Sequence, residues 1–153
     1  MRVLIQRVLE ASVAVETEVV GSIGKGYMLL VAATDGDDKE IAEKMARKVA
    51  KMRLFRDPDG PSHFHLSLLD VGGSALVVSQ FTLFADTRKG RRPSFIHAAD
   101  PEGADRLIEH FGHSLEKMGI PVETGQFGAD IQVALVNDGP VTIWLDSEEM
   151  KRK

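Results

Sequence analysis

Cysteine is absent from the 153 residues of this sequence. Without thiols the chain has no disulfide framework, no thiolate zinc site and no cysteine nucleophile. Long apolar runs are also absent, because Gln6 and Arg7 end the first run, Val3 to Ile5, long before the ~18 residues of a membrane span are reached. The sequence therefore predicts a cytoplasmic protein without a membrane partner.

An excess of positive charge is missing as well. The chain has 19 Lys and Arg against 23 Asp and Glu, a formal net charge of −4. This balance excludes a protein that coats nucleic acid by its overall charge, so a phosphate-bearing partner must be held by a local patch. Hydrophobic residues make up 43% and charged residues 27%, which favours a single globular domain over residues 1–153. A chain of this length buries about two-thirds of its surface and needs no structural metal.

The pattern of apolar residues predicts more strands than helices. Alternation over residues 1–34 indicates strands, with a short hairpin over residues 18–24 and a central strand from Tyr27 to Ala32. Further strands are expected at His63–Leu69, Ala75–Phe84, Val122–Thr124, Ile131–Val136 and Val141–Leu145, the last two joined across Asn137–Pro140. The charged tail, residues 146–153, is expected to fray.

Two helices interrupt these strands. Asp37 and Glu40 have the spacing of a capping box at the start of the first, and Asp100 followed by Pro101 starts the second, which stops at Gly119. Their apolar stripes are Ile41, Met45, Val49 and Met52, and Ala104, Leu107, Ile108, Phe111, Leu115 and Met118. The pattern predicts a strand-rich α+β domain, with mostly antiparallel or mixed sheets covered by two main helices.

Basic side chains are concentrated in two places on this acidic chain. The first group surrounds Gly90 in the segment from Ala85 to Ser94, where a local phosphate contact is the expected function and a solvated loop is the alternative. The second lies on the first predicted helix and just beyond it. The first group is Arg88, Lys89, Arg91 and Arg92, and the second is Arg47, Lys48, Lys51, Arg53 and Arg56.

Side-chain motifs of hydrolases are not found. The sequence has no Gly-x-Ser-x-Gly elbow, no Walker loop and no His-Glu-x-x-His. His63 and His65 would share a strand face, as metal ligands sometimes do, but no third ligand has suitable spacing, so no metal or cofactor is predicted. His110 and His113 lie off the apolar stripe of their helix and are expected to face solvent, and His97 is an isolated candidate for proton transfer.

Two segments stand out in structural terms. Ser79, Gln80 and Thr82 place polar groups on an otherwise apolar strand, where they either form cross-strand hydrogen bonds or line a pocket. Gly139-Pro140 is the other, and because only about one X-Pro bond in twenty is cis, the sequence alone predicts a trans bond there.

The chain resembles the D-aminoacyl-tRNA deacylase family. The resemblance rests on SQFTLFADTRKGRRPSF at residues 79–95 and NDGPVT at residues 137–142. It extends from MRVLIQRVLEASVAV at the start, through SLLDVGG, to GQFGADIQVALVNDGPVTIWL, and thus covers nearly the whole chain. Two separated motifs of this length form a specific signal.

The resemblance implies a homodimer with active sites at its interface. Its substrate would be the aminoacylated 3′ end of a tRNA carrying a D-amino acid or mischarged glycine, and its reaction hydrolysis of the ester. Ser79, Gln80, Phe81 and Thr82 would line the pocket for the aminoacyl-adenosine. One subunit would insert its Gly139-Pro140 motif into the partner's site. The resemblance thus reverses the prediction for that bond, to cis.

The implied motif accounts for chiral selection by shape. Backbone carbonyls of a rigid Gly-cisPro turn can face the substrate α-ammonium and leave no volume for an L side chain, whereas glycine still enters. Thr82 has no adjacent base in the sequence and is a poor nucleophile. The family alternative, which we favour, is that the terminal 2′-hydroxyl assists a water molecule while N–H groups near Phe81 and Thr82 stabilise the oxyanion.

This interpretation assigns contact with tRNA to Arg88, Lys89, Arg91 and Arg92, with no DNA partner. The sequence departs from the family pattern at His65, where Asn is usual, at Phe84, where Tyr or Ala occurs, and at Ile131, where Met is common. Two other functions use the same residues differently: a non-catalytic module that binds the tRNA CCA end, and an esterase of free D-amino-acid derivatives.

Overall fold

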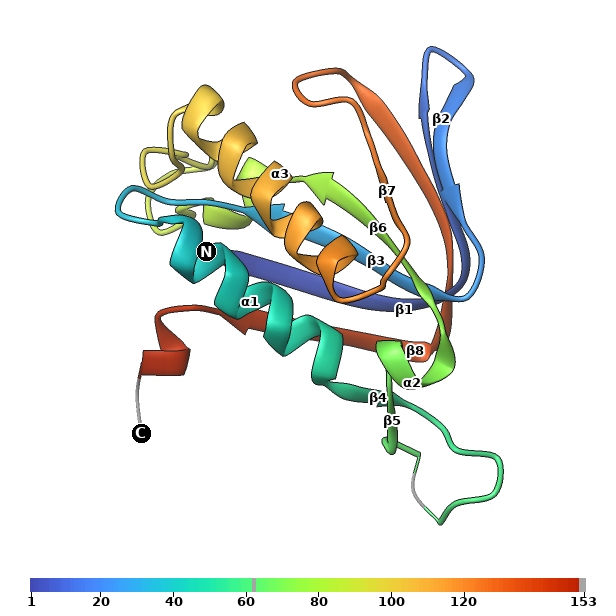
Figure 1. The fold of residues 1–153 in the computed structure, drawn as a ribbon. Helices are drawn as coiled ribbons and strands as arrows, with labels where there is room; N and C mark the ends of the chain where they lie inside the picture. Colours follow the sequence, from blue (N-terminus) through green and yellow to red (C-terminus); the bar gives the residue numbers. More distant parts are fainter. Residues whose placement is uncertain (62, 152–153) are drawn as a thin grey trace.

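A computed structural model describes residues 1–61 and 63–151. The strands are β1 Arg2–Val15, β2 Glu18–Ile23, β3 Gly26–Ala32, β4 Arg53–Phe55, β5 Leu66–Ser67, β6 Ser74–Ser79, β7 Val122–Thr124 and β8 Ile131–Asp146. The helices are α1 Lys39–Lys51, α2 Leu68–Val71 and α3 Pro101–Lys117, with 3-10 turns η1 Phe81–Phe84 and η2 Glu149–Lys151. This is the expected strand-rich α+β domain, with α1 and α3 side by side over one face of its main sheet (Figure 1).

Strand β1 organises the main sheet. It pairs antiparallel with β2, β3 and β8, while β3 pairs parallel with β6 and β6 with β7, so the sheet is mixed as predicted. The order is β2-β1-β3-β6-β7, and β8 stands outside this order and pairs with β1. The ends of β1 and β8 that lie near β2 curl toward β7, which gives the sheet a partly closed, barrel-like shape (Figure 1).

The main core fills the space between this sheet and the helices. Val3, Ile5 and Leu29 of the sheet pack there with Met45 of α1 and Phe111 of α3, all fully buried. The apolar residues that alternate along the strands therefore point to the face of the sheet that the helices cover. None of the helices within residues 1–61 and 63–151 combines the length and the apolar composition that a membrane span requires.

The predicted helix starts are nearly correct. The α1 cap is Asp38, whose carboxylate accepts a hydrogen bond from the Ile41 N–H at 2.9 Å, whereas the predicted Asp37 accepts one from the Thr34 N–H at 2.9 Å. Helix α3 starts as predicted, with the Asp100 carboxylate accepting from the Gly103 N–H at 2.9 Å. In each helix the buried residues repeat at helical spacing.

Two short segments differ from the prediction. Residues 18–23 form the single strand β2, so the hairpin is the one that joins β1 to β2 through a turn at Glu16 and Thr17, both with positive φ. The strand predicted over His63–Leu69 is only β5, Leu66–Ser67, and its last two predicted residues belong to helix α2, Leu68–Val71. Its capping box joins Ser67 and Asp70, and an apolar run this short does not distinguish helix from strand.

The end of the described chain is anchored. Ser147 accepts a hydrogen bond on its Oγ from the Met1 amine at 2.7 Å and donates its N–H to the Met1 carbonyl at 2.9 Å. The sequence predicts fraying from residue 146, whereas Asp146 ends β8 and also binds the Arg2 guanidinium. Residues 152–153 of the predicted tail lie outside the described residues.

A histidine joins the two covering helices. The His110 Nε2 lies 2.8 Å from the Glu43 carboxylate, so α3 and α1 are tied by a polar contact at their interface. The expectation that His110 faces solvent is therefore wrong, because the α1 carboxylate lies opposite it, a pairing that the sequence of α3 alone does not contain. His113, one turn along, is exposed as expected.

The structure generates a stability prediction at Tyr27. This side chain is fully buried and stacks on Phe55 with ring centroids 5.1 Å apart, but its hydroxyl has no hydrogen-bond partner among the described residues. Burial raises the pKa of this hydroxyl, and nearby Arg7 opposes the rise. Tyr27→Phe removes the unpaired group and keeps the ring, so we expect about 1 kcal/mol of added stability and a Tm about 2–4 °C higher.

Thermal and urea unfolding of both proteins measure this change. Tyr27→Leu is the matched control, since it removes the hydroxyl together with the stacked ring and should lower Tm by leaving a cavity. A Tyr27→Phe protein that is less stable than the parent contradicts the prediction.

Candidate active site

The polar residues singled out in the sequence lie where strand β6 ends. The strand stops at Ser79, the Gln80 N–H donates to the Val31 carbonyl at 2.9 Å, and the chain then turns into the 3-10 turn η1. The predicted strand from Ala75 to Phe84 is therefore too long. Because the chain leaves the sheet here, these side chains are free to face a pocket rather than a neighbouring strand.

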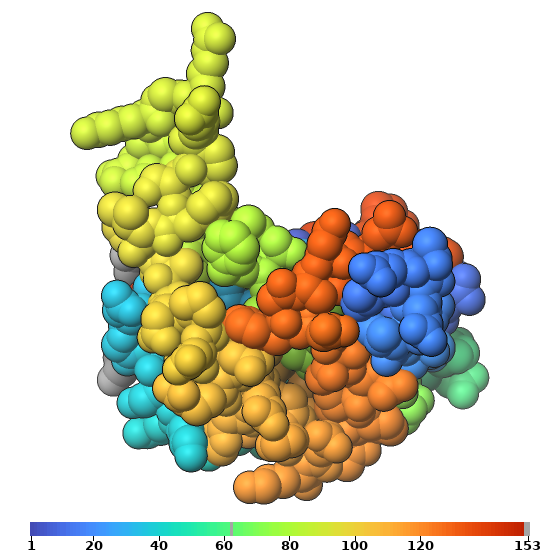
Figure 2. All heavy atoms as spheres, turned by 90° about the horizontal axis from the view of Figure 1, so that it is seen from above, coloured from blue at the N-terminus to red at the C-terminus, as the bar shows by residue number. Residues whose placement is uncertain are grey.

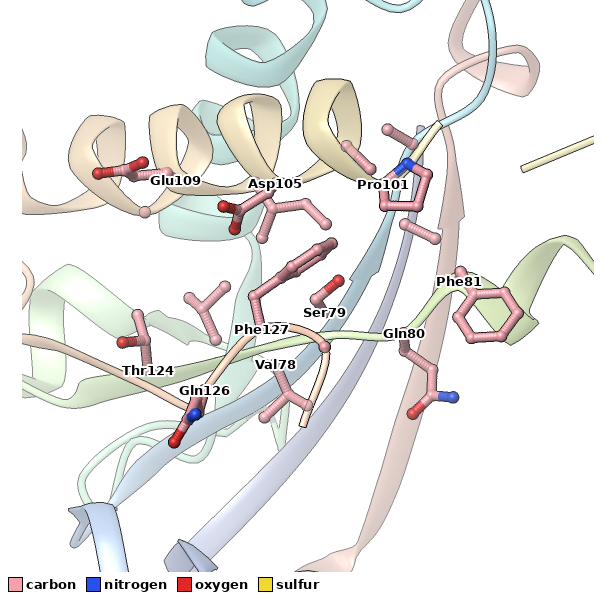
Figure 3. Close-up of a pocket in the computed structure, with 18 of the residues that line it drawn as sticks. Val78, Ser79, Gln80, Phe81, Pro101, Asp105, Glu109, Thr124, Gln126 and Phe127 are labelled. Atoms are coloured by element: carbon pink, nitrogen blue, oxygen red, sulfur yellow. The ribbon is translucent and has the colours of Figure 1, made fainter. Parts of the chain in front are cut away.

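A pocket of about 980 Å³ opens beside this segment, between α3, β6 and the loop that follows β7. Ser79, Gln80 and Phe81 line it, whereas Thr82, which the resemblance also places at the pocket, does not. Figure 3 shows Phe127 reaching across between β6 and α3, toward Ser79. Ile131, one of the residues at which the sequence departs from the family pattern, also lines the pocket.

Phe81 and Thr82 present unused backbone donors. They are the first two residues of η1, and their N–H groups have no hydrogen-bond acceptor among the described residues. Such free donors are expected at the start of a helical turn. Two adjacent N–H groups beside a pocket can together stabilise an oxyanion.

The Thr82 side chain has no base beside it. Its hydroxyl accepts a hydrogen bond from the side-chain amide of Gln80, and Thr82 is not among the residues that line the pocket. An amide N–H is a donor and cannot remove a proton. The surroundings of Thr82 therefore do not activate its oxygen as a nucleophile.

Two further contacts hold η1 in place. The Phe81 ring, 55% exposed, meets the edge of Phe95 with centroids 5.0 Å apart. On the other side, the Arg2 guanidinium donates to the Leu83 carbonyl at 2.8 Å and lies 4.4 Å from the centroid of the buried Phe84 ring. Phe84, another residue at which the sequence departs from the family pattern, thus packs against Arg2 and does not line the pocket.

Gly139 and Pro140 lie in a bulge of β8. The two halves of β8 both pair with β1, and the register shifts between Gln6–Thr142 and Val8–Asn137. The prediction of two strands joined by a turn is corrected in this respect, because both halves continue along one partner and the chain does not reverse. The Gly139-Pro140 peptide bond is cis, as the resemblance implied and against the base-rate expectation.

Only glycine fits at position 139 of this bulge. Gly139 has φ +131°, and a Cβ there would lie 2.8 Å from the Val141 side chain and 3.1 Å from the Arg7 guanidinium. The Asn137 side chain closes the bulge by accepting a hydrogen bond from the Val141 N–H at 3.0 Å. Gly139 and Pro140 are both exposed, and neither lines the pocket of their own chain.

Arg7 is the residue of this region that the sequence reasoning did not identify. Its Nε donates to the Asp138 carbonyl at 3.0 Å and its Nη1 to the Leu54 carbonyl at 2.6 Å, while its side chain is only 13% exposed. A guanidinium that is this little exposed to water needs such partners. An arginine inside an apolar strand was the signal that could have indicated this role.

The basic loop, residues 86–94, projects from the body of the molecule (Figure 2). Asp86 and Ser94 close its base with two backbone hydrogen bonds of 2.7 and 2.9 Å. Arg88 binds the Asp86 carboxylate at 2.8 Å and thereby lowers the pKa of that carboxyl well below its usual range. Lys89, Arg91 and Arg92 are exposed and form no ion pair with a described residue.

The remaining histidines do not form a metal centre. No group of three metal-binding side chains occurs among the described residues. His65 has its Nε2 3.9 Å from Asp57, and its backbone N–H closes a loop onto Phe55 at 3.0 Å. His97 lies beside the basic loop, with its Nε2 3.7 Å from Asp86, and its carbonyl accepts a hydrogen bond from the Thr34 hydroxyl.

Comparisons with known proteins agree with the sequence resemblance. The family model described as D-Tyr-tRNA(Tyr) deacylase matches residues 4–146. A protein of Thermomicrobium roseum named D-aminoacyl-tRNA deacylase is 62% identical over 151 residues, which cover 99% of this chain and 97% of that protein. A protein of the same name from Chloroflexus aurantiacus is 58% identical, with 99% and 93% coverage.

Solved structures are similar as well. One described as c-Myc DNA Unwinding Element Binding Protein superposes with a TM-score of 0.89 at 38% identity, covering 95% of this chain and 98% of that one. Another, described as a probable eukaryotic D-amino acid tRNA deacylase, has a TM-score of 0.79 at 19% identity, with 94% and 97% coverage, and supports the fold alone.

Proposed function

The chain belongs to the D-Tyr-tRNA(Tyr) deacylase family, whose members hydrolyse the aminoacyl-tRNA ester bond, and we propose how its site performs this reaction. The substrate is D-aminoacyl-tRNA, together with tRNA mischarged with glycine. The products are the free amino acid and a tRNA with a free 3′ end. The free N–H groups of Phe81, which lines the pocket, and of Thr82, which follows it in the chain, are the observation that carries this proposal.

These two donors stabilise the charge that develops during hydrolysis. The oxygen of a water molecule attacks the ester carbonyl carbon, and the carbonyl oxygen becomes an oxyanion that accepts both N–H groups. The bond to the ribose oxygen then breaks, and that oxygen takes a proton. Because Gln80 is the only described partner of the Thr82 hydroxyl, the adjacent ribose hydroxyl of the substrate, rather than a side chain, assists the water.

Chiral selection comes from the bulge that contains Gly139 and Pro140. These residues are exposed, they lie outside the pocket of their own chain, and Arg7 fixes the backbone just before them. In a homodimer they enter the partner's pocket, where their carbonyls accept hydrogen bonds from the substrate α-ammonium. Their atoms occupy the space that an L side chain would need, while glycine and D residues are admitted.

Exposed apolar side chains support the homodimer. Trp144 and Val136 lie on the side of β8 that faces away from the core, with exposed fractions of 42% and 45%. Leu9 of the neighbouring β1 is 56% exposed, and Phe81 beside the pocket is 55% exposed. We take these four side chains, three of which lie on the adjacent strands β1 and β8, as the apolar part of the dimer surface.

Matched substrates test the reaction. We expect the protein to release tyrosine from D-Tyr-tRNA and to leave L-Tyr-tRNA intact, which time courses of ester loss measure. Equal rates on both would remove the chiral argument. Loss of neither would favour a module that only binds the CCA end, and hydrolysis of D-tyrosine methyl ester at a comparable rate would favour an esterase of free derivatives.

Thr82→Ala tests the identity of the catalytic groups. The substitution keeps the backbone N–H and removes a hydroxyl that has no base, so we expect D-Tyr-tRNA hydrolysis to fall by less than about tenfold. Single-turnover rates measure the effect. A fall approaching the ~10⁴-fold loss that follows removal of a catalytic nucleophile would identify Thr82 as that nucleophile.

The basic loop is tested through its dependence on salt. Lys89→Gln, Arg91→Gln and Arg92→Gln together should weaken tRNA binding and lower the slope of log K against log salt by about two to three, one for each lost phosphate contact. Arg88→Gln is the control, because Asp86 already neutralises Arg88, and should change the slope least. A triple variant with the parent's slope would exclude the loop from tRNA binding.

A further inference from the structure

The second basic group of the sequence has no place in the reaction described so far. In the structure, four of its side chains are exposed near the C-terminal end of α1 and near β4, together with a lysine from the turn between β2 and β3. None of the five forms an ion pair with a described residue. We call this set the far basic cluster. Its members are Lys25, Lys48, Lys51, Arg53 and Arg56.

The far basic cluster is tied to the Gly139-Pro140 bulge. The Arg7 guanidinium binds the Asp138 carbonyl at 3.0 Å and the Leu54 carbonyl at 2.6 Å, and Leu54 directly follows Arg53. Phe55, the next residue, lies 5.4 Å below the Lys25 ammonium. The same guanidinium therefore fixes the position of the bulge and of β4, the strand that carries Arg53 and precedes Arg56.

The cluster lies at the opposite end of the subunit from the basic loop. In Figure 1 the loop that precedes α3 and the segment after β4 project from opposite ends of the sheet. The pocket is lined by Phe81 and Phe95, which flank the basic loop, so the basic loop of the same subunit lies beside the pocket. If the bulge enters the partner's pocket, however, the far basic cluster arrives at the rim of that pocket with it.

The pocket itself repels phosphate. Asp105, Glu109 and Glu116 of α3 and Asp130 of the opposite loop line it, and Figure 3 shows the Asp105 and Glu109 carboxylates along the α3 side. Phosphate groups are therefore excluded from the interior and must pass over the rim, where cations from outside the pocket can bind them.

We propose that the far basic cluster of one subunit binds the sugar-phosphate backbone of the tRNA whose 3′ end occupies the partner's pocket. This inference rests on the proposed function for the exchange of bulges between subunits. Each tRNA is then held by the basic loop of the subunit that receives its 3′ end and by the far basic cluster of the other.

Binding of uncharged tRNA tests the cluster without any need for catalysis. We expect Arg53→Glu/Arg56→Glu to weaken binding by about tenfold and to lower the salt slope by about two. The control Lys39→Glu/Lys151→Glu makes the same change in net charge at exposed positions near the N-terminal end of α1, and it should bind as the parent does. Arg53→Gln/Arg56→Gln should give a smaller loss, and circular dichroism verifies folding. Equal losses in cluster and control variants would overturn the assignment.

Two mixed dimers distinguish action across the interface from action within one subunit. Ser79→Trp fills one pocket, so each mixed dimer has one working pocket. In the first, Arg53→Glu/Arg56→Glu is on the subunit with the filled pocket, and in the second it is on the subunit with the working pocket. We expect KM for D-Tyr-tRNA to rise about tenfold in the first dimer alone.

Each result has a distinct meaning. A rise in the second dimer alone, or an equal rise in both, would show that the cluster does not act on the partner's tRNA. Failure of the parent protein to hydrolyse D-Tyr-tRNA would contradict the proposed function, whereas the binding measurement would still decide whether the cluster holds tRNA.

Discussion

The partly buried guanidinium of Arg7 makes the contacts on which the functional face of this chain depends. It donates to carbonyls of Leu54 and Asp138, which belong to segments far apart in the sequence. A charge that is largely removed from water is stable only when its N–H groups donate hydrogen bonds to other groups of the protein. Because one guanidinium must bind both carbonyls, Arg7 holds the Gly139-Pro140 bulge and β4 in fixed positions relative to each other.

Charge is distributed over the subunit in a way that its net value conceals. The net charge of −4 averages an acidic pocket wall on α3 with a projecting basic loop and a far basic cluster. This separation of charge suits a substrate that has negative phosphates along its backbone and a positive ammonium group at its reacting end. Backbone N–H groups at Phe81 and Thr82 supply the stabilisation that ionisable side chains provide in other hydrolases.

Local signals predicted the elements that are long or capped. The starts of α1 and α3, the alternation along β1 and the mixed sheet followed from spacing and capping residues. Short elements were missed, because the four residues of α2 and of η1 span too few positions for their period to be recognised. The sequence marked the polar segment from Ser79 to Thr82 but left open whether it faced a strand or a pocket, because that depended on where β6 ends.

The sequence by itself determined that no thiol chemistry is present, that strands predominate, that cations gather in two places, and that the chain resembles one enzyme family. Only the tertiary structure decided that Phe95 and Phe127 join Ser79 at one pocket, and that Arg7 connects the bulge to the far basic cluster. The reason is physical. Helical and strand periods are properties of neighbouring residues, whereas a pocket and a buried charge are completed by segments that meet only when the sheet and helices pack.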